Sequence, residues 1–361
     1  MEAQRASRNR KVSVSITGRR SEMINVGVVG CGYWGPNLIR NFVTYPGTNV
    51  VWACDLNEER LVKILSPYPN IRRTTDLSDI LSDDTVHAVA IATPVNTHYP
   101  LAKASLESGK HVLVEKPLAS NVSQGEKLIA IAEKNNVQLM CDHTYCYTGA
   151  VRKIKEIVDS GSLGDILYYD SVRINLGLFQ QDVNVIWDLA PHDLSILDFL
   201  IDHKPILVSA HGVSHAGNHI ENIAYISMSY QNSFISHFHV NWLSPVKIRT
   251  TIIGGSEKML VWNDLDNAEK IKVYDSGIKV KKEEADIREK LLISYRSGDV
   301  HAPRVDHTEA LSLLVKEFAD CIEEGRPPLT DGGAGLRVLR ILDAAERSIK
   351  ADGASVRISN S

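Results

Sequence analysis

Two short segments carry side chains that can move protons or stabilise charge. Lys116 follows directly after the apolar run His111–Val114, and Asp188 and His192 stand four residues apart. At that spacing on a helix, both side chains point the same way. Neutral histidine is a general base near neutral pH, and a lysine can stabilise a developing oxyanion. Spacing alone favours simpler explanations. Lys116 would then be an ordinary solvated lysine, Asp188 would cap the start of a helix, and His192 would be a histidine in the core.

A third segment has the pattern Gly-x-Gly-x-x-Gly, at Gly30, Gly32 and Gly35. It follows a β-rich run and opens a helical stretch, which is the context in which this pattern binds dinucleotides. We expect Gly30 to allow a tight turn, Gly32 to let the backbone approach a pyrophosphate, and Gly35 to let the helix pack closely. The pyrophosphate would lie at the helix N-terminus. A glycine-rich turn that binds no nucleotide is the competing interpretation.

Asp55 closes the next β-rich run, about 20 residues after the glycine motif. Its carboxylate can accept hydrogen bonds from both hydroxyls of an adenosine ribose, and it would repel a 2′-phosphate. The expected cofactor is therefore NAD rather than NADP. Arg60, one turn into the following helix, keeps NADP as an alternative.

Strand and helix patterns alternate from Ile24 to His143, which is typical of a parallel sheet covered on both faces. The expected strands are Ile24–Val29, Val50–Cys54, Ala88–Ala92, His111–Val114 and Gln138–Cys141. The expected helices are Asn37–Val43, Glu58–Leu65, Leu77–Leu81, Pro100–Glu107 and Gln124–Lys134. Lys116 and the glycine motif then lie at the carboxyl ends of strands, where open α/β sheets bind ligands.

After Tyr147 the pattern changes to consecutive strands with hairpin-like turns, which predicts a mostly antiparallel sheet. The expected strands are Ile166–Asn175, Ile206–Val213, Asn222–Tyr230, Ser233–Trp242, Lys247–Gly254 and Glu257–Trp262, and the expected helices are Ala150–Asp159, Asp188–Ile201, Thr308–Glu324 and Gly335–Lys350. Pro191 is expected in the first turn of its helix. The fold class is thus α/β: a Rossmann domain over residues 23–143 and an α+β domain with a large open sheet over residues 144–361.

Composition excludes several classes of protein. Among 361 residues, 40 Lys and Arg face 44 Asp and Glu, so a general nucleic-acid or membrane-surface binder is not expected. No apolar run approaches the roughly 18 residues of a membrane span. Five cysteines without a CxxC pair favour a reduced, cytoplasmic setting. Residues 1–22 are basic and are expected to be a disordered extension or to precede the true start at Met23, with binding to an acidic partner as the alternative.

In order and approximate spacing, these motifs resemble the Gfo/Idh/MocA oxidoreductases, from Met23 to the C-terminus. Residues 92–98, Ala-Thr-Pro-Val-Asn-Thr-His, are similar to the family's nicotinamide-side loop. The resemblance implies that NAD contacts Gly30, Gly32, Tyr33, Trp34, Gly35, Asp55, Thr93, Pro94, Asn96, His98, Glu115 and Lys116. It also implies that Lys116 and His192 form the catalytic pair and that Asp188 contacts the substrate.

For oxidation of a secondary alcohol, two assignments stay open. Neutral His192 could take the hydroxyl proton while Lys116 stabilises the alkoxide, or Lys116 could be the base while His192 orients the substrate. Asp188 would orient His192 or bind a neighbouring hydroxyl.

Residues 32–42, 173–177 and 182–188 resemble the branch of the family that acts on nucleotide-linked sugars. This implies oxidation at C3 of a UDP-N-acetyl sugar, in polysaccharide biosynthesis. Arg173 and Asn175 are candidates for sugar or phosphate contact, with a solvated strand face as an equal alternative. A ketosugar reductase and an inositol or polyol dehydrogenase are the enzyme alternatives. A non-catalytic NAD-binding sensor is the alternative from another class.

Other histidines lie outside this assignment. His211, His215 and His219 have H-x3-H-x3-H spacing, but their β-rich surroundings favour a loop, so no metal site is expected. His237 and His239 share one face of the strand Ser233–Trp242. In the family such a sheet face packs against another subunit, which implies a homodimer or homotetramer.

Overall fold

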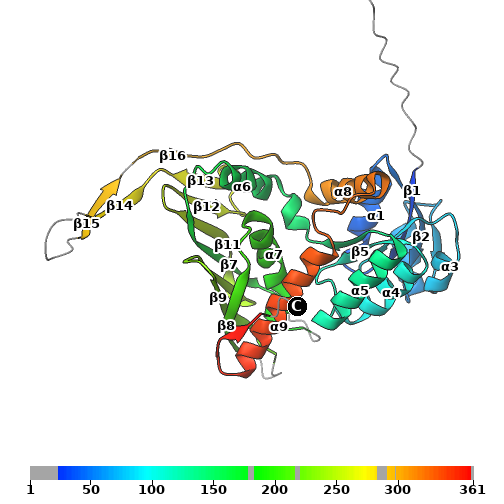
Figure 1. The fold of residues 1–361 in the computed structure, drawn as a ribbon. Helices are drawn as coiled ribbons and strands as arrows, with labels where there is room; N and C mark the ends of the chain where they lie inside the picture. Colours follow the sequence, from blue (N-terminus) through cyan, green and yellow to red (C-terminus); the bar gives the residue numbers. More distant parts are fainter. Residues whose placement is uncertain (1–22, 178–182, 216–219, 283–290, 297, 359–361) are drawn as a thin grey trace, which may run out of the picture.

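The structure is a computed structural model that describes residues 23–177, 183–215, 220–282, 291–296 and 298–358. The expected basic tail, Asp182 and His219 lie outside the described residues. Figure 1 shows a parallel sheet with its helices on one side of the molecule and a second, larger sheet on the other.

The N-terminal sheet is parallel, with the order β3-β2-β1-β4-β5-β6 among the described residues. Its strands are β1 Ile24–Val29, β2 Thr48–Cys54, β3 Arg72–Thr74, β4 Ala88–Ile91, β5 His111–Glu115 and β6 Leu139–Asp142. All four residues of β4 are buried, because helices cover both faces of the sheet. The predicted Rossmann-type sheet is confirmed. The edge strand β3 was not predicted, because its sequence Arg-Arg-Thr has no apolar pattern.

Helices connect these strands: α1 Gly35–Thr44, α2 Glu58–Leu65, α3 Leu77–Leu81, α4 Val95–Glu107 and α5 Val122–Asn135. The side chains of Asn57, Asp76 and Asn121 accept hydrogen bonds from the first turns of α2, α3 and α5. Such caps fix where a helix begins. Helix α4 begins at Val95 rather than at Pro100, so Pro100 lies inside it.

The second domain is built on a larger sheet with the order β16-β13-β12-β11-β7-β10-β9-β8-β17 in the described part of the chain. Its strands are β7 Ile166–Leu176, β8 Pro205–Val213, β9 Ile223–Tyr230, β10 Ile235–Asn241, β11 Leu243–Gly255, β12 Met259–Asn263, β13 Ile271–Tyr274, β16 Val300–His301 and β17 Val356–Arg357. The sheet is mostly antiparallel, as predicted, with β7 and β10 as a parallel pair. Strands β14 Gly277–Lys282 and β15 Leu291–Arg296 form a separate hairpin.

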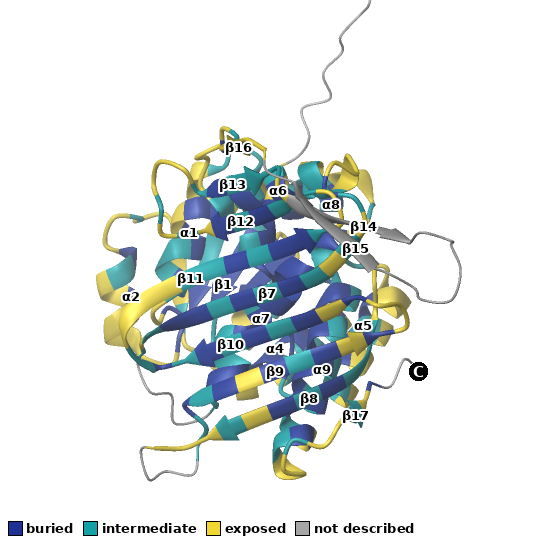
Figure 2. Cartoon of the chain, turned by 90° about the vertical axis from the view of Figure 1, so that its left-hand side faces the viewer, coloured by how far each residue is buried: buried dark blue, intermediate teal, exposed yellow. Residues whose placement is uncertain are grey.

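One face of this sheet is covered by α6 Gly149–Asp159, α7 Val185–Leu200 and α9 Gly332–Lys350, and the other face is open (Figure 2). Asn184 caps α7 by accepting from the N–H groups of Ile186 and Trp187. Because α7 begins at Val185, Pro191 lies in the helix interior, and its predicted place in the first turn is wrong.

The last helices return to the Rossmann domain. Helix α8 Ala310–Glu324 packs against α1, and its Phe318 meets Phe42 edge-on with ring centroids 6.4 Å apart. Helix α9 packs against α5 and β6 of the first domain and against α7 and β8 of the second. Residue 144 is therefore not a clean boundary, because α8 shares its core with the first domain.

The five cysteines are all buried and free of disulfides. Cys141 and Cys146 are among these buried thiols. Within the described ranges, no helix has the length and apolar character needed to cross a membrane.

Candidate active site

A cleft of about 1710 Å³ lies where the carboxyl ends of the parallel strands meet the second domain. It is lined by these predicted residues: Gly30, Gly32, Tyr33, Trp34, Asp55, Thr93, Pro94, Asn96, Glu115, Lys116, Asn175, Asp188 and His192. Gly35, His98 and Arg173 lie behind its walls. The structure therefore brings most of the predicted residues together at one place.

The three glycines of the motif have different surroundings. Gly30 has a φ of +91°, and a Cβ there would lie 2.6 Å from the Ala92 carbonyl oxygen. A Cβ on Gly35 would lie 2.0 Å from the Gly30 carbonyl oxygen, because α1 packs directly on the turn. A Cβ on Gly32 would meet no described atom within 4 Å, so the backbone is open toward the cleft. No described side chain caps α1, which leaves its first N–H groups available to a pyrophosphate. The loop fits a dinucleotide.

Asp55 is held at the cleft by backbone donors. The N–H of Cys31 lies 2.7 Å from Oδ2, and the N–H of Asn57 lies 2.9 Å from Oδ1. Arg60 Nη1 is 3.2 Å from both oxygens. The Arg60 side chain is 46% exposed, so it is the donor that a ribose diol can displace. The fixed carboxylate fits the adenosine ribose of NAD, with Arg60 beside it.

The loop after β4 is tied down by His98. Thr93, Pro94 and Asn96 line the cleft, but His98 is 1% exposed. Its two ring nitrogens lie 2.8 Å from the carbonyl oxygens of Pro117 and Thr93. His98 therefore joins this loop to the segment after β5 from behind, and it does not line the cleft where the cofactor is expected.

Lys116 and Asp188 form an ion pair that faces the cleft. Lys116 Nζ lies 2.8 Å from the Asp188 carbonyl oxygen and 3.3 Å from Oδ1. Trp242 Nε1 donates to Asp188 Oδ2 at 3.0 Å. Among the described residues, no hydrogen bond joins Asp188 to the ring of His192. Asp188 thus positions the lysine, and of its two predicted roles, orienting His192 or binding a neighbouring hydroxyl, the first has no hydrogen bond among the described residues to support it.

His192 lies one turn after Asp188 on α7 and lines the same cleft. Its ring meets the ring of Tyr145 edge-on at 5.0 Å between centroids. Burial lowers the pKa of His192 well below its usual value, and the positive charges of Lys116, Arg173 and Arg249 lower it further. His192 is therefore neutral at physiological pH, as a general base must be.

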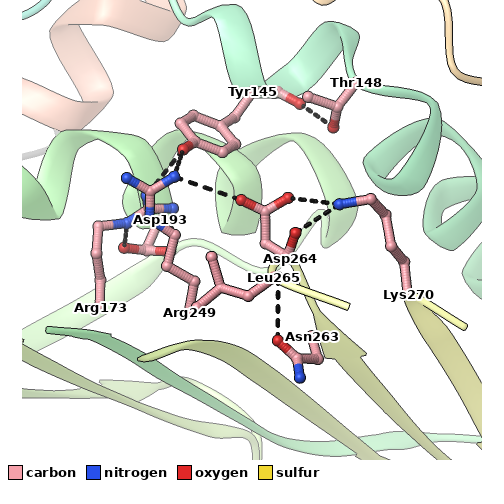
Figure 3. Close-up of polar contacts among 9 residues, drawn as sticks. All are labelled: Tyr145, Thr148, Arg173, Asp193, Arg249, Asn263, Asp264, Leu265 and Lys270. Carbon is pink, nitrogen blue, oxygen red and sulfur yellow. Dashed lines mark hydrogen bonds and ion pairs between the residues drawn. The ribbon is translucent and has the colours of Figure 1, made fainter. Parts of the chain in front are cut away.

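Arg173 is buried beneath the cleft wall and does not reach the cleft. Its side chain is 3% exposed, with Nε 2.6 Å from Asp193 Oδ2 and Nη2 3.1 Å from Oδ1. Its Nη1 donates to the hydroxyl of Tyr145 at 3.1 Å (Figure 3). Burial opposes its charge, but Asp193 and Tyr145 outweigh burial and raise the pKa of Arg173. Of the two residues predicted to contact the substrate, Asn175 lines the cleft and Arg173 does not.

Glu115 and Asp142 form a carboxyl pair beside Lys116. They occupy paired positions at the ends of β5 and β6. Glu115 Oε1 and Asp142 Oδ2 are buried oxygens that meet no N–H or O–H donor from the described residues. Because two buried carboxylates side by side repel each other when both are ionised, the pair favours a state that keeps one proton. Burial, followed by the charge of Asp142, raises the pKa of Glu115 well above its usual value.

The Glu115→Gln variant is expected to gain stability relative to the wild type as the pH rises. Above the ordinary pKa of 4.5, the unfolded chain releases the Glu115 proton while the folded pair keeps it. The wild-type free energy of unfolding then falls by up to about 1.4 kcal/mol per pH unit until the pH passes the folded pKa. An amide at position 115 donates to Asp142 without a proton to lose. Urea titrations at about pH 5 and about pH 7.5 measure the change.

The matched control is Glu133→Gln, on the exposed side of α5. Its difference from the wild type should be the same at both pH values. An equally constant difference for Glu115→Gln would show that residues 115 and 142 hold no shared proton.

The sequence interpretation missed several cleft residues, among them Tyr145, Trp242 and Arg249. Tyr145 lies in the short 3-10 turn Thr144–Tyr147 after β6, and Arg249 lies on β11. None belongs to a local motif, so the sequence carries no signal that they approach Lys116 and His192.

Comparison with known proteins agrees with this geometry. Residues 24–143 match the oxidoreductase family with an NAD-binding Rossmann fold, and residues 151–261 match the Gfo/Idh/MocA C-terminal domain. A UDP-N-acetylglucosamine 3-dehydrogenase of Acidithiobacillus ferrooxidans is 24% identical over 88% of this chain and 94% of its own length. Its solved structure has a TM-score of 0.74 at 22% identity, over 91% of this chain and 98% of that chain.

Levoglucosan dehydrogenase, solved with NADH and levoglucosan, has a TM-score of 0.78 at 20% identity, over 94% of this chain and 100% of that chain, which shows a shared fold. An uncharacterised oxidoreductase of Streptococcus pneumoniae is 29% identical over 58% of this chain and 60% of its own length. The match to an uncharacterised oxidoreductase of Escherichia coli covers 48% of this chain and 52% of that protein. The chain therefore spans little more than half the length of such curated relatives. With both domains matched, the chain belongs to the Gfo/Idh/MocA oxidoreductase family.

Proposed function

We propose that the protein is an NAD-dependent dehydrogenase that oxidises a secondary hydroxyl of a sugar to a ketone. The observation that carries this proposal is that Lys116, Asp188 and His192 line the same cleft as the dinucleotide loop. Lys116 follows β5 of the first domain, whereas Asp188 and His192 lie on α7 of the second, and the three meet at the carboxyl end of β5.

NAD would lie along the Rossmann side of the cleft. Asp55 would hold the adenosine ribose, and the glycine loop would hold the pyrophosphate at the start of α1. Thr93, Pro94 and Asn96 line the cleft between that loop and Glu115. Bound NAD supplies nicotinamide C4, which accepts a hydride from the substrate carbon.

Three side chains handle the hydroxyl group. The Lys116 ammonium donates a hydrogen bond to the substrate oxygen and stabilises the charge that develops as the proton leaves. His192 accepts this proton at a ring nitrogen, and the carbon–oxygen bond becomes a carbonyl as the hydride departs. Asp188, fixed by Trp242, keeps the ammonium in place. Lys116 as the proton acceptor is the competing assignment.

The substrate that we propose is a nucleotide-linked sugar oxidised at C3, such as a UDP-N-acetyl sugar. The similarity to UDP-N-acetylglucosamine 3-dehydrogenase along 88% of the chain supports this choice. The cleft volume of about 1710 Å³ also supports it. Pockets for one small ligand are usually about 300–1,000 Å³, so this cleft has room for a dinucleotide and a second nucleotide-sized ligand.

The test is NADH formation by absorbance, with NAD or NADP and a panel of UDP-N-acetylglucosamine, its uronic acid, myo-inositol and glucose. Each assay is repeated with 2-oxoglutarate as a recycling acceptor, because tightly held NADH would hide turnover. We expect NAD-dependent turnover of a UDP-N-acetyl sugar that disappears in the Lys116→Ala and His192→Ala variants.

Other outcomes assign other functions. Turnover of myo-inositol alone would move the protein to the polyol dehydrogenases, and NADH-dependent reduction of a ketosugar alone would make it a reductase. NAD binding without turnover of any sugar would favour a sensor.

We also propose that the open face of the second sheet pairs with another copy of the chain. On this face, Tyr225 is 45% exposed and stacks on His239 at 4.3 Å between ring centroids, and Ile235 is 51% exposed. Exposed aromatic and aliphatic side chains of this kind mark protein interfaces. The molecular mass of the purified protein, measured by sedimentation, tests the proposal. A monomeric mass at micromolar concentration would contradict it.

A further inference from the structure

Two arginines stand directly opposite each other on adjacent strands of the second sheet. Arg173 on β7 and Arg249 on β11 are register partners. Like charges at opposed positions repel each other, so each arginine needs a counter-charge. Arg173 has the buried carboxylate of Asp193 to itself. Arg249 shares Asp264 with Lys270 (Figure 3).

Asp264 neutralises Arg249 only partly. Arg249 Nη1 lies 3.5 Å from Oδ2, and Lys270 Nζ lies 3.5 Å from Oδ1. A charge-assisted hydrogen bond is about 2.7–2.9 Å long, so both contacts are loose. Two cations around one carboxylate leave an excess of one positive charge. Arg249 and Asp264 line the cleft, with side chains 28% and 18% exposed, so this excess charge faces it.

The described residues satisfy the Arg249 guanidinium only in part. Its Nη1 donates to the Tyr145 hydroxyl at 2.7 Å, but neither Nε nor Nη2 has an acceptor among the described residues. A buried donor such as this Nε is costly to leave without an acceptor. Nη2 is not among the buried atoms, so it is the guanidinium N–H group that can donate to a carboxylate or phosphate in the cleft.

Tyr145 supplies another donor beside this edge. Its hydroxyl oxygen accepts from Arg173 at 3.1 Å and from Arg249 at 2.7 Å, which occupies both lone pairs. The hydroxyl hydrogen is therefore left to donate elsewhere. Tyr145 lines the cleft, and its ring contacts His192, so this donor lies next to the reacting centre.

We infer that Arg249, together with Tyr145, binds an anionic group of the substrate, a carboxylate or a phosphate. Arg249 comes from the sheet of the second domain, across the cleft from the dinucleotide loop, so its partner is the substrate rather than the cofactor. The inference rests on the proposed function and narrows it: the substrate is an acidic or phosphorylated sugar, and a neutral polyol lacks the group that Arg249 holds.

The test compares Arg249→Gln and Arg249→Lys with the wild type in the full chain with NAD. The probes are UDP-N-acetylglucosamine, its uronic acid, glucuronate, UDP and myo-inositol. For an anionic sugar, Arg249→Gln should raise KM about 10- to 100-fold and leave kcat within about threefold. Arg249→Lys should raise KM less, because lysine keeps the positive charge but lacks the planar guanidinium. Arg347→Gln, on the exposed face of α9, is the matched control and should change neither constant.

Calorimetric titration with the same probes gives Kd without turnover, so it remains informative if no sugar is oxidised. Weaker binding of UDP by Arg249→Gln would identify the diphosphate as the anion. Weaker binding confined to the uronic acids would identify the sugar carboxylate. If Arg249→Gln turned over and bound every anionic probe like the wild type, the inference would be overturned while the proposed function stood. Preferred turnover of myo-inositol would also overturn it.

Discussion

The His192→Asn variant is expected to lose about 10²- to 10⁴-fold in kcat with the sugar substrate, the range of a removed general base. Asparagine keeps a hydrogen-bonding side chain of similar size but cannot accept a proton at neutral pH. The dinucleotide loop lies on the other wall of the cleft, so the Kd for NAD should change by less than about threefold. Steady-state kinetics and fluorescence titration with NADH measure the two quantities. His203→Asn, on an exposed turn, is the control and should behave as the wild type.

The pH dependence of wild-type kcat/KM tests the same role of His192. Burial and the charges of Lys116, Arg173 and Arg249 lower the pKa of His192, so His192 gains a proton only below its usual value of 6.5. Wild-type kcat/KM should therefore stay high through neutral pH and fall only on the acid side of 6.5. The Arg249→Gln variant removes one of these charges and should move the acid limb upward. If kcat/KM instead rose at alkaline pH and showed no fall at acid pH, Lys116 would be the group that accepts the hydroxyl proton.

Asp193→Ala is expected to lower the free energy of unfolding by about 3–5 kcal/mol, the usual cost of breaking a buried ion pair. The side chains of Arg173 and Asp193 are 3% and 4% exposed, so the variant leaves a buried guanidinium without its carboxylate. Urea denaturation at neutral pH measures the loss. The exposed Lys155–Asp159 pair on α6 is the control, and Asp159→Ala should cost less than about 0.5 kcal/mol.

A double variant separates stability from activity. Arg173→Met with Asp193→Leu removes both buried charges, and apolar replacements of such pairs are often close to neutral. We expect it to recover most of the lost stability but not the activity, because Tyr145 loses its hydrogen bond from Arg173. A loss below about 1 kcal/mol in Asp193→Ala would show that the pair does not hold β7 to α7.

Much of the fold was predictable because its signals are local. The bounds of β1, α2 and α3 agree with the sequence interpretation, since Ile24–Val29 is a short run rich in β-branched residues and the caps Asn57 and Asp76 mark helix starts. The parallel pairing of β7 with β10 had no local signal, because it depends on which strands meet across the sheet. Short strands such as β16 and β17 form only because a neighbouring edge accepts them.

The same distinction applies to the site. Lys116, Asp188 and His192 were predictable because each stands in a motif at a strand end or in a helix turn. Arg173 and Arg249 are both arginines on strands, and no local pattern tells them apart. Their difference comes from α7, which brings Asp193 onto Arg173 and leaves Arg249 with a shared carboxylate.

The return of α8 and α9 to the Rossmann domain affects how the cleft can open. Two domains joined by one linker can swing apart as rigid bodies about a hinge. Here α9 packs on α5 and β6 as well as on α7 and β8, and α8 packs on α1. Moving the two domains apart would disrupt these close-packed contacts, and packed protein interiors deform little. Ligands therefore meet a cleft of nearly fixed width, and selection between them depends on preformed shape and charge rather than on domain closure.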